Sequence, residues 1–243
     1  METPLPTAAE APEPRGLLGS FNELLTQPLG IVQRAREGRP GASFGLLAGA
    51  FAGYALYGAA AGFFQGGSQI LVAALKAPLI LAMTFLLCLP SLYVFTSMAG
   101  ARWTRRTFLA AVSGFAGTLA LLLLALLPVA WLFSVSSRYL GSIVWLHVLL
   151  WSLVLILGWR FLRRALDAIG AGDGMSFWLL LFLIVSFQAA TFLRPVLWSD
   201  PGKPLFRFQE KMFFLEHLGK AMDQQAAGAE PASPAEKEKR KAG

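Results

Sequence analysis

The polar residues that could do chemistry are few, and they lie inside or beside long apolar runs. Gln65, Gln69 and Lys76 fall within or just after the stretch YALYGAAAGFFQGGSQ. Gln69 and Lys76 are separated by about two helical turns, so they share one helix face. An ammonium at membrane depth costs about 2.5–3.5 kcal/mol on insertion scales. Two interpretations follow for Lys76: it snorkels to lipid headgroups, or it belongs to a polar pocket with walls from Gln65, Gln69, Tyr54 and Tyr57.

His147 is the other polar residue placed for chemistry, because it lies between Trp145 and Trp151 in a later apolar run. A histidine there could relay protons or bind a metal. The chain has only two histidines, His147 and His217, and its apolar runs contain no carboxylates. We therefore expect His147 to form a hydrogen bond with the backbone or with a tyrosine.

No standard catalytic pattern is visible in the chain. HExxH, Walker, GxGxxG and Ser-His-Asp arrangements are missing, so the sequence predicts no catalytic residues and no cofactor. The single cysteine, Cys88, excludes an internal disulfide and a cysteine-based metal cluster. The sequence therefore favours a protein that is not an enzyme.

Long apolar runs must position these residues. The 243 residues are 56% hydrophobic and only 14% charged, with a mean hydropathy of +0.57, and a water-soluble fold normally carries more charge. Five runs are long and apolar enough to predict membrane-spanning helices. They cover residues 43–64, 70–95, 107–133, 139–160 and 176–192. The predicted fold is an all-α polytopic transmembrane bundle of about five spans, with interfacial amphipathic helices at both ends.

Flanking segments complete the predicted organisation. Residues 1–16 and 225–243 read as disordered tails because their composition cannot bury a core. Residues 17–40 form an amphipathic interfacial segment, which Pro28 divides, and Ser20 with Glu23 matches a capping box at its start. Residues 41–195 are the transmembrane domain, and residues 196–224 are a second interfacial segment.

Arginine and lysine set the predicted orientation. They precede the first run and fill the second and fourth connections, whereas the first and third connections hold only Arg138. The positive-inside rule then places the N-terminus in the cytoplasm, and five crossings place the C-terminus outside. Basic residues after the fifth run leave an alternative, in which that run does not cross. Their position beside apolar runs argues for contact with anionic lipid and against nucleic acid.

Two sets of residues are candidates for contacts. Glycines spaced four apart line helix faces, which indicates close packing inside the bundle or against another subunit: Gly45, Gly49, Gly53, Gly58, Gly62 and Gly66. Lys76 and Arg194 both fall near the predicted outer end, where two cations would attract an anionic lipid headgroup or an acidic partner segment.

A family resemblance rests on particular motifs. The lead-in LLTQPLGIVQRAREGRP with five spans resembles the Yip1-type membrane domain in its bacterial form. The block YGAAAGFFQGGSQILVAALKAPLILAMTFLLCLPSLYVF, together with TFLRPVLWSDPGKPLFRF, is similar to a group of bacterial multi-span proteins. The resemblance covers about residues 20–215 and includes a K-x-P motif (Lys76, Pro78) and an L-R-P motif (Arg194, Pro195). Eukaryotic Yip1 proteins bind small GTPases through an N-terminal region that this chain does not match.

Two functions follow as hypotheses. The first is a non-enzymatic scaffold or accessory subunit of a membrane assembly, with a membrane-protein partner or a second copy of the chain. The alternative is a small transporter or channel component with a polar pocket near Gln65, Gln69 and Lys76, because polar groups at depth need water or partners.

Overall fold

The computed structural model describes residues 16–38, 43–63, 67–101, 104–136, 140–168, 170 and 176–192. Over these residues the chain is helical and forms no strand, so the predicted all-α class is confirmed. The helices are α1 (Gly16–Thr26), α2 (Gly30–Arg36), α3 (Ser43–Gly62), α4 (Gln69–Met98), α5 (Arg105–Ser136), α6 (Leu140–Asp167) and α7 (Ser176–Phe192). Predicted residues that lie outside the described part include Gln65, Gly66, Arg194, both tails and the C-terminal interfacial segment.

Among the residues that the structure describes, four helices, α3 to α6, are long and apolar enough to cross a membrane. The chain is therefore a multi-pass membrane protein. The fifth apolar helix, α7, has the predicted bounds and 17 residues, a length of about 25 Å. That is somewhat shorter than a hydrocarbon core of about 30 Å.

The helix α6 is longer than its predicted span. It continues beyond Arg160 to Asp167, because the apolar residues Phe161, Leu162, Ala165 and Leu166 recur at helical spacing and are buried. The intervening arginines are exposed. The predicted span ended at the charged residue Arg160. The packing of these apolar residues against the bundle extends the helix to Asp167.

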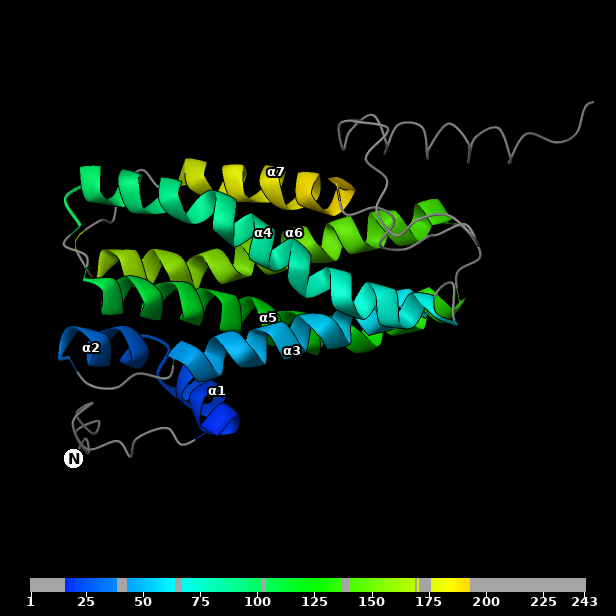
Figure 1. The fold of residues 1–243 in the computed structure, drawn as a ribbon, viewed down its shortest axis with the longest axis horizontal. Coiled ribbons are helices and arrows are strands. Elements are labelled where there is room, and N and C mark those ends of the chain that lie inside the picture. Colours follow the sequence, from blue (N-terminus) through cyan, green and yellow to red (C-terminus); the bar gives the residue numbers. More distant parts are fainter. Residues whose placement is uncertain are drawn as a thin grey trace, which may run out of the picture.

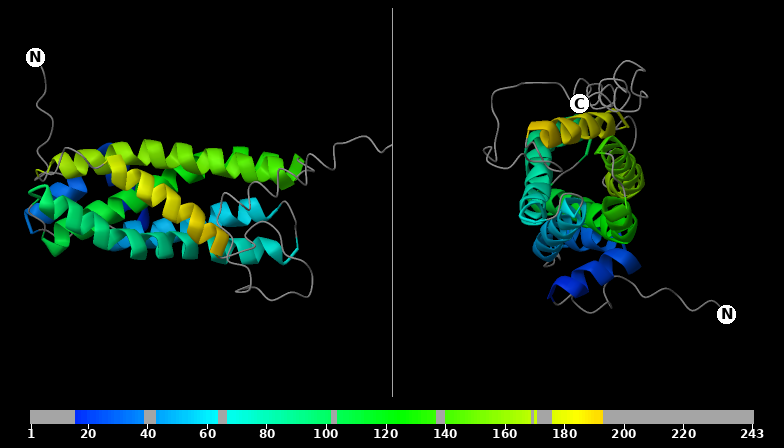
Figure 2. Two further views of the ribbon diagram at one scale, coloured as in Figure 1. Left: turned by 90° about the horizontal axis from the view of Figure 1, so that it is seen from above. Right: turned by 90° about the vertical axis from the view of Figure 1, so that its right-hand side faces the viewer.

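The long helices form one bundle (Figure 1). The helix α3 packs against α4 and α5, and α5 packs against α6. Seen end-on, α7 bridges α4 and α6 on the side opposite α3 and α5 (Figure 2). The contact of α7 with α4 is more extensive than its contact with α6.

An aromatic cluster fixes the first half of α7. Trp178 and Phe182 are fully buried, and both contact Phe115 of α5 at ring-centroid distances of 6.3 and 5.6 Å. Phe85 of α4 contacts Phe182 at 5.3 Å. The Trp178 Nε1–H also donates to the Cys88 carbonyl oxygen, 3.2 Å away. Edge-to-face rings and this hydrogen bond make the N-terminal half of α7 part of the core.

The N-terminal helices α1 and α2 pack against α3 and α5 (Figure 1). Pro28 separates them, as predicted. Leu24, Ile31 and Val32 are buried, and Arg34 Nε lies 2.9 Å from Glu23 Oε1 with both side chains almost fully buried. This ion pair lacks hydrogen-bond geometry, and Glu23 Oε2 has no hydrogen-bond partner within the described ranges.

The predicted capping box is wrong. The helix α1 begins at Gly16, so Ser20 lies inside it and donates to the Gly16 carbonyl oxygen at 3.0 Å. Glu23 instead pairs with Arg34 of α2. Burial of the carboxylate between the two helices competes with capping, and the ion pair offsets part of its desolvation.

Four of the predicted packing glycines contact elements of this same chain. A Cβ atom at Gly45 or Gly49 would meet Ser20 or Phe21 of α1, and one at Gly53 would meet Ala120 of α5 at 3.2 Å. A Cβ atom at Gly58 would collide with the Ala73 carbonyl oxygen of α4. Gly62 is buried at the end of α3.

Candidate functional site

The predicted polar site is only partly visible in the structure. Lys76 lies on α4 with 3% of its surface exposed, and Gln69 is the first residue of that helix. Gln65 and Arg194 lie outside the described residues. The structure therefore does not test whether these four residues come together, whereas the expected wall residues Tyr54 and Tyr57 both line a cavity.

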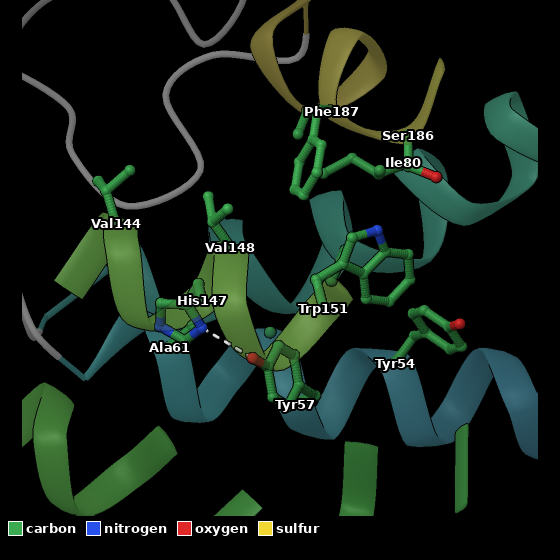
Figure 3. A pocket seen from close by; sticks show the side chains of 13 residues that line it. Tyr54, Tyr57, Ala61, Ile80, Val144, His147, Val148, Trp151, Ser186 and Phe187 are labelled. Carbon is green, nitrogen blue, oxygen red and sulfur yellow. Dashed lines mark hydrogen bonds between the residues drawn. The ribbon is translucent and has the colours of Figure 1, made fainter. Parts of the chain in front are cut away.

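The cavity lies between α3, α4, α6 and α7 (Figure 3) and has a volume of about 180 Å³. It is partly open, and the surface it presents is almost wholly apolar. Its lining residues are Tyr54, Tyr57, Gly58, Ala61, Ala77, Ile80, Val144, His147, Val148, Trp151, Ser186, Phe187 and Ala190.

Small residues on facing helices explain why this space is not filled. Gly58 and Ala61 come from α3, Ala77 from α4, and Ser186 and Ala190 from α7. The aromatic cluster fills the bundle at the first half of α7, but the second half of α7 brings mainly short side chains to its inner face. Closely packed interiors leave few such voids, so the cavity is a distinctive feature of this bundle.

A tyrosine–histidine pair forms one wall of the cavity. Tyr57 Oη of α3 lies 2.8 Å from His147 Nδ1 of α6, and the two rings meet edge to face with centroids 5.6 Å apart. This hydrogen bond agrees with the expectation that His147 pairs with a tyrosine or the backbone. Figure 3 shows the Tyr57 hydroxyl directed at the imidazole. Since the residues are 90 positions apart, the hydrogen bond also fixes α3 against α6.

Two buried polar atoms beside the cavity have no hydrogen-bond partner among the described residues. They are Tyr54 Oη and His147 Nε2. Tyr54 is 3% exposed, and its ring packs edge to face against Trp151 with centroids 5.7 Å apart. By contrast, Ser186 Oγ donates to the Phe182 carbonyl oxygen at 2.7 Å. A buried polar atom without a hydrogen-bond partner costs about 1–3 kcal/mol. Within the described ranges the site has two such atoms.

The arrangement suits the binding of an apolar group. Across the described ranges, no three His, Cys, Asp or Glu side chains come together where they could hold a metal ion. None of the described residues that line the cavity is charged. What the site offers is apolar surface with a neutral tyrosine–histidine pair at its edge.

Comparison with known proteins gives no match: no family model, no curated protein and no solved structure is similar to this chain.

Sequence reasoning had singled out Tyr54, Tyr57 and His147 but could not join them into one site. It missed Trp151 as a wall residue, and the contribution of α7 through Ser186, Phe187 and Ala190. The available signal was compositional: small residues interrupt the apolar runs at Gly58, Ala61 and Ala190. Such residues are as typical of close helix packing as of a cavity.

Proposed function

We propose that this chain is a non-enzymatic membrane protein that binds one lipophilic molecule in the cavity between α3, α4, α6 and α7. The observation that carries the proposal is the cavity itself, an apolar space of about 180 Å³ inside a helical bundle. In this role the protein is an accessory subunit whose ligand is held within the membrane.

The size of the cavity sets the part of the ligand that enters. An engineered apolar cavity of about 150 Å³ binds benzene. A volume of about 180 Å³ therefore accommodates a ring or a short hydrocarbon segment, and the rest of the molecule must lie outside. An amphiphile that inserts one end fits this description better than a polar solute.

Lateral entry is consistent with the packing of α7. This helix is anchored to α4 and α5 by Trp178 and Phe182, but its contact with α6 is less extensive than its contact with α4. The cavity lies beside the less anchored half of α7, and it is partly open. A molecule dissolved in the bilayer could enter between α6 and α7 without crossing the aqueous phase.

Orientation and location complete the proposal. Exposed arginines of α2, α5 and α6 occur at helix ends that lie at one end of the bundle (Figure 1). Arg36 Nη1 donates to the Ala168 carbonyl oxygen at 2.8 Å, and Arg106 Nη1 donates to that of Gly38 at 2.7 Å. We propose that this end faces the cytoplasm of a bacterial inner membrane, in keeping with the positive-inside rule, and that the chain is a Yip1-like protein.

Native mass spectrometry of the full-length protein tests the proposal. The wild-type chain, released gently from its membrane, should retain one amphiphile per chain. Ala190→Phe and Val148→Phe each place a phenyl ring at the cavity wall and should abolish the bound mass. Filling a cavity typically adds about 0.5–2 kcal/mol of stability, so these variants should remain folded.

The matched control is Ala125→Phe, which adds the same ring to an exposed position of α5. It should leave the bound mass unchanged. Equal retention by folded Ala190→Phe, Val148→Phe and Ala125→Phe proteins would show that the amphiphile binds elsewhere and would overturn the proposal.

A further inference from the structure

The helix α6 presents one continuous exposed face along its length. Apolar residues recur on this face at helical spacing and are exposed: Trp145, Leu149, Leu153 and Ile156. Arg160, Arg163 and Arg164 continue the same face, because they follow Ile156 by four, seven and eight residues and are also exposed. In a multi-pass membrane protein the apolar part of this face lies against lipid tails, so the three arginines lie directly beyond the tails.

The three arginines fall within the thickness of one headgroup layer. Trp159 immediately precedes them, and tryptophan is enriched where the hydrocarbon core meets the headgroups. The helix rises about 6 Å from Arg160 to Arg164. A headgroup layer is about 5–8 Å thick, since a bilayer of about 40–45 Å contains a hydrocarbon core of about 30 Å. All three guanidinium groups are therefore within reach of phosphates in a single leaflet.

The inner side of α6 holds this surface in place. The residues that alternate with the arginines are buried against the bundle: Phe161, Leu162, Ala165 and Leu166. Arg36 Nη1 of α2 also donates to the carbonyl oxygen of Ala168, which directly follows α6, at 2.8 Å. The helix therefore stays folded beyond the hydrocarbon core, and it carries its arginines on an element tied to the rest of the protein.

The side chains of the three α6 arginines are available to a ligand. None of them forms an ion pair or a hydrogen bond with another residue that the structure describes. By contrast, Arg36 and Arg106 each donate to a backbone carbonyl oxygen at this end of the bundle. Asp167 is exposed on the same face of α6, so this part of the helix carries an excess of two positive charges.

We propose that Arg160, Arg163 and Arg164 bind the headgroup of an anionic phospholipid, whose acyl chains lie along the exposed apolar residues of α6. Guanidinium groups form paired, charge-assisted hydrogen bonds with phosphate oxygens. Residues three and four apart on a helix lie about 5–6 Å from one another, so two of these arginines can hold one phosphate. The apolar surface that continues the face favours a lipid over a soluble anion or an acidic peptide.

This lipid site is separate from the cavity. The α6 residues that line the cavity are Val144, His147, Val148 and Trp151, and their helical positions place them on the side of α6 opposite the arginines. The two sites can therefore be tested independently of each other.

Native mass spectrometry of the full-length protein, titrated with phosphatidylglycerol or with phosphatidylcholine of the same acyl chains, tests the inference. Wild type should bind phosphatidylglycerol more tightly. A basic residue near an anionic membrane surface contributes about fivefold to binding. Arg160→Gln, Arg163→Gln and Arg164→Gln, which keep a good helix former, should each weaken phosphatidylglycerol binding about fivefold and leave phosphatidylcholine binding unchanged. Asp167→Asn should strengthen phosphatidylglycerol binding, because it removes the negative charge on this face.

The matched control is Arg105→Gln, which removes the same charge from an exposed position of α5 at the same end of the bundle. It should leave phosphatidylglycerol binding unchanged. Equal weakening by Arg105→Gln, or equal affinity of wild type for the two lipids, would overturn the inference. Ala190→Phe, which fills the cavity, should keep the preference for phosphatidylglycerol, and loss of the preference in that variant would place the headgroup at the cavity instead of on α6.

Discussion

Removal of Arg34 tests whether the Glu23–Arg34 pair is buried as the structure indicates. The two side chains are 5% and 7% exposed, with Nε and Oε1 2.9 Å apart. Breaking such a pair typically costs about 3–5 kcal/mol, because the remaining charge is left buried. In Arg34→Met, however, Glu23 can take up a proton, and this limits the cost.

The limit can be worked out from the pKa of Glu23. Burial raises this pKa above its ordinary value of 4.5 even beside Arg34, which lowers it. Protonating a carboxyl of pKa 4.5 at pH 7 costs about 3.4 kcal/mol, at 1.36 kcal/mol per unit. At pH 5 the same step costs about 0.7 kcal/mol. The native state of Arg34→Met binds the extra proton, so its stability relative to wild type rises as the pH falls.

Hydrogen exchange of the Ile31 and Val32 amides in α2 measures the effect, since both residues are fully buried. After correction for intrinsic exchange, Arg34→Met should open α1 and α2 up to about 300-fold more often than wild type at pH 7. At pH 5 the difference should fall to a few-fold. Glu23→Met leaves a guanidinium that cannot lose its proton, so its penalty should not diminish at pH 5.

The control is Glu23→Leu with Arg34→Met, which replaces both charges by apolar groups. Such replacements of buried pairs are often neutral or stabilising by about 1–4 kcal/mol. A penalty of Arg34→Met that is equal at pH 5 and pH 7, or a double variant as unstable as the single ones, would refute the reasoning.

Three further predictions concern the long helices. Gly58→Ala should destabilise the bundle by about 1–3 kcal/mol, because the added Cβ atom meets a carbonyl oxygen of α4. Gly53→Ala should cost less, because its Cβ atom meets a side chain at 3.2 Å. Thermal unfolding in detergent compares the two variants, and equal losses of stability would contradict this packing. Tyr57→Phe should lower stability by about 1–3 kcal/mol by leaving His147 Nδ1 unpaired, and an unchanged melting temperature would argue against that hydrogen bond. Reporter fusions after Asp173 and at the C-terminal end should report the cytoplasm and the opposite side, respectively; two cytoplasmic signals would mean that α7 does not cross.

Hydropathy was sufficient to predict the long helices, for a clear physical reason. A span must satisfy its backbone internally and match the hydrocarbon thickness, so the apolar run at residues 107–133 predicts the position of α5 directly. The C-terminal end of α6 could not be predicted from hydropathy. The predicted span ended at Arg160 because of its charge, but buried apolar residues beyond it continue the helix to Asp167.

The sequence alone could not predict which distant residues pair with one another. Nothing in the neighbourhood of Glu23 distinguishes a capping carboxylate from one that pairs with Arg34, because the choice depends on how α1 and α2 fold together. His147 was expected to form a hydrogen bond with the backbone or with a tyrosine, and the chain has four tyrosines. The cavity depends on the positions of small side chains on α3, α4 and α7 together, and its volume is a property of the packed bundle.

The most direct test of the central claim is photochemical labelling by a membrane amphiphile whose acyl chain carries a diazirine. In nanodiscs of the full-length protein, the account predicts saturable attachment to the cavity residues of α6 and α7, such as Val148 and Phe187, and its loss in Ala190→Phe. Attachment confined to lipid-exposed residues such as Leu75 and Leu79 of α4, unchanged by Ala190→Phe, would contradict it.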